Sequence, residues 1–436
     1  MTIATETKRD NLLERYRAIY PRWVPVLYEQ PLELVRGEGA YVWDSEDRQY
    51  LDFFGGIATT ISGHAVPEII DALMEQASKL IHVSNTYLIR RQVELAEKLA
   101  QLSGIPSAKC FFVNSGTEAV EAALLTACAS RGSNEVIALR RSYHGRSFST
   151  IAVTGSPAYK STTFSPLNVQ YAPEPYCYRC PFGLEYGSCG FRCAHDVEHI
   201  VQNATSGNVA AMIAESIMGV AGCIPLPPEY FSIVKEILDR YGIPLIADEV
   251  QAGIGRAGGA FFYILSQGVV PDMIVAAKSL GNGLPIGVVI GRADLLDGIP
   301  GVSISTFGGN PLVMAGALAN LDYLERLDHM NRALELGNYL LDGLRALQGR
   351  HELIGDVRGS GLLLAAELVS DQQTKEPARE ATMRVVEAAR ERGLLVGKGG
   401  SYGNVLRIAP PVAITMADCD VALRILDEAL GEALAA

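Results

Sequence analysis

Apolar residues recur with two alternating spacings along most of this chain. Beyond about residue 65, short apolar runs alternate with segments in which apolar residues recur every three or four positions. The apolar runs that predict strands are residues 110–116, 135–140, 209–216, 243–250 and 273–279. The segments with helical spacing are residues 68–80, 91–103, 117–131 and 229–241. This alternation predicts a mostly parallel sheet flanked by helices.

The two ends of the chain follow other patterns. Residues 8–20 have helical spacing, and residues 39–55 alternate like a short hairpin. After a long helical segment at 307–327, strand and helix patterns mix as in a smaller α+β region. We therefore expect an N-terminal segment packing with the small domain, a large domain and a C-terminal small domain, at residues 1–64, 65–325 and 326–436.

Composition narrows the class of protein. The chain has 436 residues, of which 48% are hydrophobic and 20% charged, which is typical of a soluble globular protein. Its net charge of -12 argues against nucleic acid or an anionic membrane as the main partner. The first 20 residues lack the apolar core of a signal peptide, and no apolar run has the length of a membrane span. We therefore expect a cytoplasmic protein.

Four of the eight cysteines fall in one irregular segment, "CYRCPFGLEYGSCGFRC". They are Cys177, Cys180, Cys189 and Cys193. The C-x2-C element resembles half of a zinc ribbon, and His195 and His199 lie close by. The C-x3-C element that follows is not a standard zinc spacing, so the pattern favours reduced thiols with no metal, with zinc as the alternative.

Polar residues follow several of the predicted strands. Because parallel strands place ligands at their carboxyl ends, these residues are the candidates for chemistry. They are Asn114–Thr117, Tyr143–Arg146, Glu215, Asp248–Gln251 and Lys278. A small-residue turn, carboxylates and a lysine are thus expected at one edge of one sheet.

Two of these features have an ordinary alternative. The turn "NSGT" before a helix presents backbone amides and the Ser115 and Thr117 hydroxyls to an anion such as phosphate, but it would equally make a Ser/Thr N-cap. Lys278 follows an apolar run and precedes a glycine-rich turn, where a lysine either serves chemistry or reaches water. The convergence at one sheet edge favours the chemical interpretation.

Two short motifs resemble those of nucleotide-binding proteins. Residues 253–258 satisfy G-x-G-x-x-G, but Asp248–Gln251 separate them from the strand and the acidic residue at the required distance is missing. Lys278–Ser279 resembles the end of a P-loop without its glycines. We set both the dinucleotide and the Walker A interpretations aside.

A phosphate turn, a carboxylate and a lysine together fit pyridoxal 5′-phosphate (PLP), whose aldehyde forms a Schiff base with lysine. From about residue 30 onward the chain resembles class III aminotransferases of fold type I, most closely the alanine–glyoxylate aminotransferase 2 branch. The matching motifs are "NSGTEAVEAA", "YHGRS", "IADEVQAGIGRAG", "PDMIVAAKSLGNGLPIG", "STFGGNP", "IGDVRGSGLLLAAE" and "LRIAPP". The resemblance implies an α/β fold type I enzyme that transfers an amino group by a ping-pong mechanism.

The resemblance also implies roles around the cofactor ring. Lys278 would be the Schiff-base lysine and would carry a proton between the substrate Cα and the cofactor. Asp248 would pair with the pyridine nitrogen. Val250 would pack under the ring and Tyr143 would stack on its other face. Gln251 would reach the phenolic oxygen.

The resemblance assigns the remaining site residues as follows. Glu215 would lie near the phenolic oxygen. The phosphate would be bound by Ser115, Gly116, Thr117 and, across a subunit interface, Thr306. Arg407 would hold the substrate carboxylate, and the other substrate-binding residues would be Arg146 and Ile57. The role of Thr306 implies a homodimer with shared sites, which could pair into a dimer of dimers, and no metal site is implied.

Departures from the family pattern leave the substrate open. Glu215 is followed by Ser216 where many relatives have proline, and Val220 replaces the glutamate that pairs with the substrate arginine in the 4-aminobutyrate branch. The expected reaction moves an amino group from an amino acid or ω-amino acid to pyruvate, glyoxylate or 2-oxoglutarate. The alternative is a PLP-dependent decarboxylase or lyase on the same scaffold. A silent binding protein would lack Lys278 or Asp248, and both are present.

Overall fold

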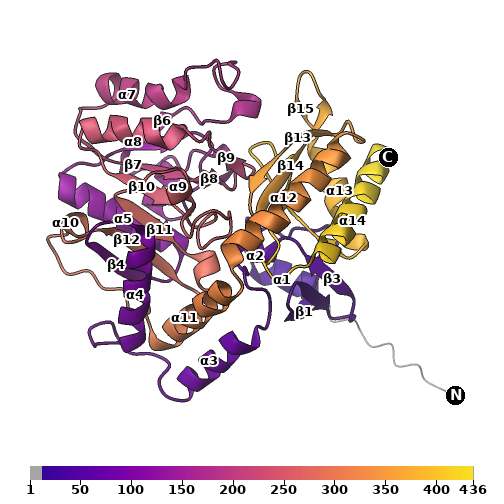
Figure 1. Ribbon diagram of the computed structural model, residues 1–436, viewed down its shortest axis with the longest axis horizontal. Helices are drawn as coiled ribbons and strands as arrows, with labels where there is room; N and C mark the ends of the chain where they lie inside the picture. Colours follow the sequence, from indigo (N-terminus) through magenta and orange to yellow (C-terminus); the bar gives the residue numbers. More distant parts are fainter. Residues whose placement is uncertain (1–11, 436) are drawn as a thin grey trace.

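The computed structural model of the protein describes residues 12–435, and a seven-stranded sheet lies in the left half of the view in Figure 1. In spatial order its strands are β4 (Ala108–Val113), β12 (Gly287–Arg292), β11 (Met273–Ala276), β10 (Leu245–Asp248), β7 (Val209–Glu215), β5 (Glu135–Leu139) and β6 (Asn168–Ala172). Neighbouring strands from β11 to β6 are parallel, whereas β12 is antiparallel to β11 and β4. The mostly parallel sheet is confirmed, with one reversed strand that the sequence pattern did not predict.

The central strands read as continuous apolar runs because both faces of the sheet are covered. Every residue of β7, β10 and β11 is buried. The helix α5 (Gly116–Arg131) packs on one face, where Val120 and Ala123 share a hydrophobic core with Ile213. The other face is covered by helices whose core includes Leu99 and Val234. They are α4 (Arg90–Ser103), α7 (Arg192–Ala204) and α8 (Tyr230–Arg240).

Predicted helices are present with shifts of up to four residues at their ends. The segment expected at 68–80 is α3 (Pro67–Ala77), and those expected at 91–103, 117–131 and 229–241 are α4, α5 and α8. The long segment at 307–327 forms α11 (Pro311–Arg326).

The shorter elements are α2 (Gly55–Ala58), α6 (Phe148–Val153), α9 (Tyr263–Ser266), α10 (Ala293–Leu296), β8 (Ile217–Met218), β9 (Ile224–Pro225), η1 (Pro157–Tyr159), η2 (Cys177–Arg179) and η3 (Lys278–Leu280), where η marks a 3-10 helix.

A second, antiparallel sheet occupies the C-terminal part of the chain, drawn in orange and yellow in Figure 1. Its strands in spatial order are β13 (Ile354–Ser360), β14 (Leu363–Asp371), β18 (Val405–Ile408) and β17 (Gly397–Gly399), with β15 (Glu376–Pro377) pairing with β14. The helices of this region are α12 (His329–Gln348), α13 (Arg379–Glu391) and α14 (Met416–Ala435). The mixed pattern of this region is thus confirmed as α+β.

The N-terminal strands join the C-terminal part of the chain. The predicted hairpin is formed by β2 (Tyr41–Asp44) and β3 (Gln49–Asp52), with β1 (Leu34–Glu38) beside β2. Strand β3 pairs in parallel with β16 (Leu394–Leu395). The helix expected at 8–20 is present as α1 (Leu12–Ile19), and residues 1–11, including its predicted start, lie outside the described residues.

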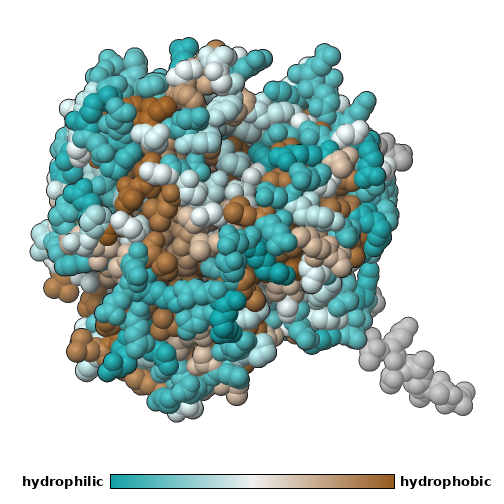
Figure 2. Space-filling view, in the orientation of Figure 1, coloured by the Kyte–Doolittle hydropathy of each residue, from teal (hydrophilic) through white to brown (hydrophobic). Residues whose placement is uncertain are grey.

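The surface is mixed in character. Figure 2 shows one face covered largely by hydrophilic side chains, with hydrophobic ones gathered in patches between them. Leu88 and Val302, both in loops, are 99% and 94% exposed. Among residues 12–435, none of the helices has the combined length and hydropathy needed to cross a membrane.

Two helical glycines allow a matched test of packing. A Cβ on Gly337 in α12 would lie 2.1 Å from the Gly361 carbonyl oxygen, whereas one on Gly431 in α14 would meet nothing within 4 Å. We expect Gly337→Ala to lower the free energy of unfolding by about 2 kcal/mol, because overpacking outweighs helix propensity. Gly431→Ala should raise it by up to about 1 kcal/mol. Urea unfolding of both variants measures the difference, and equal effects would contradict the packing account.

Candidate active site

One cavity of about 310 Å³ lies at the edge where the parallel strands end. It brings together most of the residues predicted from the sequence. These are Ser115, Gly116, Thr117, Tyr143, Arg146, Glu215, Asp248, Val250, Gln251 and Lys278. Its wall is completed by Thr59, Asn114, His144, Gly145, Ala277 and residues 284–286. The expected convergence of a small-residue turn, carboxylates and a lysine is therefore present.

Lys278 follows β11 after one residue, Ala277, and lines the cavity. Its side chain is partly exposed to the cavity, and protein atoms enclose the rest. Burial and the charge of Arg407 lower the pKa of Lys278 to about 8, against opposing effects of Asp248 and Glu215. An amine with this pKa is substantially neutral near pH 8 and can act as a nucleophile or base.

The backbone at Lys278 is strained and heavily supported. Its φ is 43°, a left-handed conformation that costs an L-residue about 1–2 kcal/mol. Asn320 donates to the carbonyl oxygens of Ser279 and Leu280 at 2.9 and 3.1 Å. The Ser279 hydroxyl donates to the Ala58 carbonyl oxygen at 3.3 Å. These contacts fix the turn that carries the amine.

Arg256 fastens the same turn to the C-terminal part of the chain. Its side chain is fully buried, and Nε donates to Ser279 Oγ at 3.2 Å. Nη1 donates to the carbonyl oxygens of Leu362, Ala409 and Pro410 at 3.3, 3.4 and 3.0 Å. Burial lowers the pKa of Arg256 to about 10. Sequence reasoning missed this residue because it stands inside the rejected glycine motif at 253–258.

Asp248 ends β10 and is held by a histidine. Its Oδ2 lies 2.7 Å from His144 Nδ1, and its Oδ1 accepts from the Val250 amide at 3.1 Å. Both side chains are buried, and His144 Nε2 is buried without a hydrogen-bond partner. The sequence placed His144 at this edge but assigned it no role. Its signal was its position directly after Tyr143.

Glu215, at the end of β7, is a buried acceptor. Its Oε1 accepts from the Tyr143 amide at 2.9 Å and its Oε2 from the Gly219 amide at 2.8 Å. Burial raises the pKa of Glu215 to about 7, and the neighbouring Asp248 charge acts in the same direction. The group is therefore able to hold or release a proton near neutral pH.

Arg407 on β18 is connected to the cavity by a hydrogen bond to Gln251, which lines it. It is buried and does not line the cavity itself. Its Nη2 donates to Gln251 Oε1 at 2.6 Å, and its Nε is buried without a partner. A buried guanidinium bonded to a neutral amide is poorly compensated, and a guanidinium binds a carboxylate well through two parallel hydrogen bonds.

The small-residue turn opens helix α5. Ser115 is the N-cap and accepts from the Glu118 amide at 3.3 Å, so the ordinary capping interpretation holds for its side chain. The Thr117 hydroxyl accepts from the Arg146 amide at 3.0 Å. A Cβ on Gly116 would lie 3.0 Å from a Val250 methyl group, so a larger residue there would require Val250 to shift by a few tenths of an ångström. The helix N-terminus still directs its positive end at the cavity.

Besides Arg407, two further predicted residues lie outside the cavity. Thr306 is exposed on the loop before α11, beside Ser305, whose hydroxyl accepts from Asn114 Nδ2 at 3.3 Å. Ile57 is 47% exposed in the turn of α2, where its φ of 66° is unusual for a β-branched residue. The chain by itself therefore does not bring either side chain to Lys278.

Comparison with known proteins identifies the family. The family model "Aminotransferase class-III" matches residues 24–430. The chain is a class III aminotransferase. It is 39% identical to the leucine/methionine racemase of Thermococcus litoralis, covering 98% of this chain and 96% of that protein. It is 37% identical to alanine–glyoxylate aminotransferase 2 homolog 2, mitochondrial, of Arabidopsis thaliana, covering 93% and 84%.

A solved structure supports the cofactor and the fold of this aminotransferase. An amine transaminase from an uncultivated Pseudomonas species, in its PLP-bound form, has a TM-score of 0.88 at 30% identity, covering 93% of this chain and 95% of that one. Class III aminotransferases depend on PLP, so PLP is the cofactor, and fold type I is confirmed. The site fits it, since a helix N-terminus, a buried carboxylate and a low-pKa lysine surround one cavity of adequate size.

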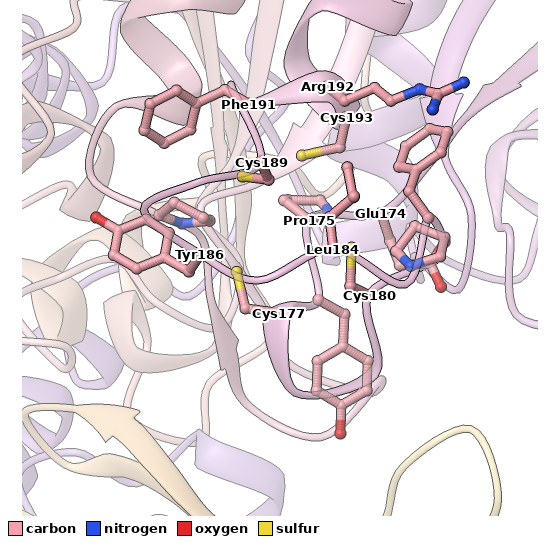
Figure 3. A pocket seen from close by; sticks show the side chains of 14 residues that line it. Glu174, Pro175, Cys177, Cys180, Leu184, Tyr186, Cys189, Phe191, Arg192 and Cys193 are labelled. Carbon is pink, nitrogen blue, oxygen red and sulfur yellow. The ribbon is translucent and has the colours of Figure 1, made fainter.

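The cysteine-rich segment forms a separate site in this aminotransferase. All four of its cysteines line a second, small cavity of about 20 Å³, and Figure 3 shows their side chains around it. Their thiols are free. Within residues 12–435, no group of three or more His, Cys, Asp or Glu side chains is placed to hold a metal ion.

The pKa of Lys278 can be measured without cofactor. Competitive acetylation of the PLP-free protein, followed by mass spectrometry, should show half-maximal reactivity of Lys278 near pH 8 instead of the usual value near 10.4. Asp248→Asn removes a negative charge that favours the ammonium form, so the midpoint should fall further. A midpoint above about 10 would show that burial and the charge of Arg407 do not lower the pKa of Lys278.

Proposed function

We propose that this class III aminotransferase moves the amino group of a carboxylate-bearing amino acid to a 2-oxo acid by a ping-pong mechanism. The candidate donors are amino acids and ω-amino acids, and the candidate acceptors are pyruvate, glyoxylate and 2-oxoglutarate. The observation that carries the proposal is the state of Arg407, which is buried yet bonded to the neutral Gln251. A carboxylate on either substrate would supply the missing anion.

The cavity residues divide the work of such a reaction. When bound, PLP supplies an electron sink for the negative charge that develops at the substrate Cα. Lys278 Nζ would hold the cofactor aldehyde and, once released, take the proton from Cα. Asp248, oriented by His144, would hold a proton at the pyridine nitrogen. The N-terminus of α5 would bind the phosphate, with Ser115, Gly116 and Thr117.

The remaining residues would position the ring and the substrate. Tyr143 would cover one ring face and Val250 the other, both from the cavity wall. Glu215 and Gln251 would contact the phenolic oxygen, with the raised pKa of Glu215 allowing it to donate a proton there. Arg146 would assist with a second carboxylate, and Ile57 would contact the substrate if the α2 turn moves toward the cavity. The structure by itself leaves Ile57 outside.

The direct experiment is a single half-reaction. The PLP-loaded enzyme is given a panel of amino donors without any acceptor, and loss of the visible absorbance of the lysine-bound cofactor is recorded. A productive donor should bleach the band and leave one equivalent of the corresponding oxo acid. Lys278→Ala should give no turnover and no borohydride-fixed cofactor. Carbon dioxide release in place of the oxo acid would instead support the decarboxylase alternative.

A racemase is the second candidate, favoured by the 39% identity to the leucine/methionine racemase over 429 residues. Fold and cofactor do not separate the two activities, because both begin by removing the Cα proton. Incubating one enantiomer of leucine or alanine in D2O without acceptor separates them. A racemase produces the other enantiomer carrying deuterium at Cα over many turnovers, whereas a transaminase stops after one equivalent per site.

We also propose a cytoplasmic homodimer whose subunits share their sites, and division into domains at 1–64, 65–325 and 326–436. Exposed Thr306, on a loop with the 94% exposed Val302, supports the shared site, because both side chains are free to meet a second chain. The eight unpaired cysteines support a reducing compartment. Sedimentation analysis tests the dimer, and mixing Thr306→Ala with Lys278→Ala chains tests the sharing through complementation.

Arg407 should discriminate between substrates. Removing one member of a buried hydrogen-bonded charge pair costs about 2–5 kcal/mol, so Arg407→Ala should lower kcat/KM for an amino acid donor by about thirtyfold or more. A simple uncharged amine, which offers the arginine no carboxylate, should be affected far less. The cofactor spectrum serves as the control and should not change. Equal losses for both donor types would remove Arg407 from the role of carboxylate anchor.

A further inference from the structure

The cysteine-rich loop joins β6 to α7 and is independent of the PLP cavity. None of its residues lines that cavity, yet Cys177, Cys180, Cys189 and Cys193 all line one small space of their own (Figure 3). Cysteine packs like any small apolar side chain, so filling so small a space does not by itself require four thiols. Their gathering therefore raises the question of whether they react with one another.

Backbone geometry selects one pair among the four. Cys177 begins the 3-10 helix η2 and Cys180 caps it, with the Arg179 amide bonded to the Tyr176 carbonyl oxygen at 3.0 Å. A 3-10 helix has three residues per turn and rises about 2.0 Å per residue, so side chains three apart are eclipsed at about 6 Å between Cα atoms. Disulfides require Cα separations of about 4.4–6.8 Å. Because Cys180 directly follows the last helical residue, Arg179, this spacing places the pair near bonding range.

The two ends of this turn are fixed to the C-terminal sheet. The Tyr176 hydroxyl donates to Glu367 on β14, and Arg179 Nε donates to the same carboxylate at 2.6 Å. Arg179 Nη2 also donates to the Lys375 carbonyl oxygen at 2.6 Å. Tyr176 directly precedes Cys177 and Arg179 directly precedes Cys180, so the backbone between the two cysteines has little freedom left to lose when a bond forms.

Access differs among the thiols. Cys177 is exposed, whereas Cys180, Cys189 and Cys193 are partly buried. Burial and the neighbouring thiols raise the pKa of Cys177 and that of Cys193, the latter to about 11. Cys177 is therefore the thiol that an oxidant in solution meets first, and its reaction is expected to accelerate as the pH rises toward its pKa.

We propose that Cys177 and Cys180 form a reversible dithiol–disulfide centre that exchanges with low-molecular-weight disulfides of the glutathione type. The Cys177 thiolate, its proton released to solvent, attacks one sulfur of the small disulfide and displaces one thiolate. The Cys180 thiolate then attacks Cys177 Sγ and displaces the second. The protein gives up two electrons and two protons, and the small disulfide is reduced to two thiols.

The test uses the reduced, PLP-loaded enzyme. It is incubated with glutathione disulfide, quenched with acid, alkylated and digested for mass spectrometry. The peptide containing Cys177 and Cys180 should lose two hydrogen atoms, resist alkylation and regain both thiols with dithiothreitol. The rate should rise between pH 7 and 9. Cys180→Ser should instead accumulate glutathione on Cys177, because no neighbouring thiol resolves it.

One control variant and three alternative results make the test of the proposed disulfide decisive. Cys110→Ser removes a half-buried cysteine of β4, whose pKa burial raises to about 12, and should leave the reaction unchanged. Three results would overturn the proposal. They are a stable glutathione adduct on Cys177 in the parent enzyme, a bond from Cys177 to Cys189 or Cys193, and one equivalent of bound zinc that protects the four thiols. Because no step involves PLP, failure here leaves the proposed transamination untouched.

Discussion

The enclosed amine of Lys278 is the constraint on which the rest of the active site depends. Two carboxylates, Asp248 and Glu215, favour its charged form, while burial and Arg407 favour the neutral form, and the outcome is a pKa of about 8. Burial is the largest cause of this shift, and the enclosed site that produces it lies at the edge where the parallel strands end. The strained φ of 43° shows that local backbone preference yields to this placement.

Much of this arrangement could be predicted from the sequence because buried strands leave a clear pattern of apolar residues. Strands β7, β10 and β11 are buried on both faces, so they appear as uninterrupted apolar runs that end in Glu215, Asp248 and Lys278. The reversed strand β12 was missed because an apolar run carries no sign of its direction. Its first residue, Gly287, approaches the Ser115 carbonyl oxygen too closely for any side chain, a tertiary requirement that no local pattern encodes.

Other residues escaped prediction for reasons that are equally physical. Arg256 stands in a glycine motif whose letters match a dinucleotide fingerprint, and only the fold reveals that its partners are carbonyl groups more than 100 residues away. His144 is adjacent to a predicted site residue, but its bond to Asp248 spans 104 positions. Conversely, the expected roles of Ile57 and Thr306 depend on a turn conformation and a second chain. A single-chain sequence pattern contains neither of these.

The guanidinium of Arg256 has a consequence for how the two sheets respond to solution conditions. It joins the Lys278 turn to the segments around Leu362 and Pro410, and each of its hydrogen bonds ends on a neutral oxygen. A junction held together by surface ion pairs weakens when salt is added and when its carboxylates are protonated. A fully buried cation held by carbonyl dipoles is shielded from counterions and has no carboxylate among these acceptors to titrate. The junction beside the reactive lysine is thus built to keep its shape as ionic strength changes and as the pH falls, leaving any large rearrangement under those conditions to segments farther from this point.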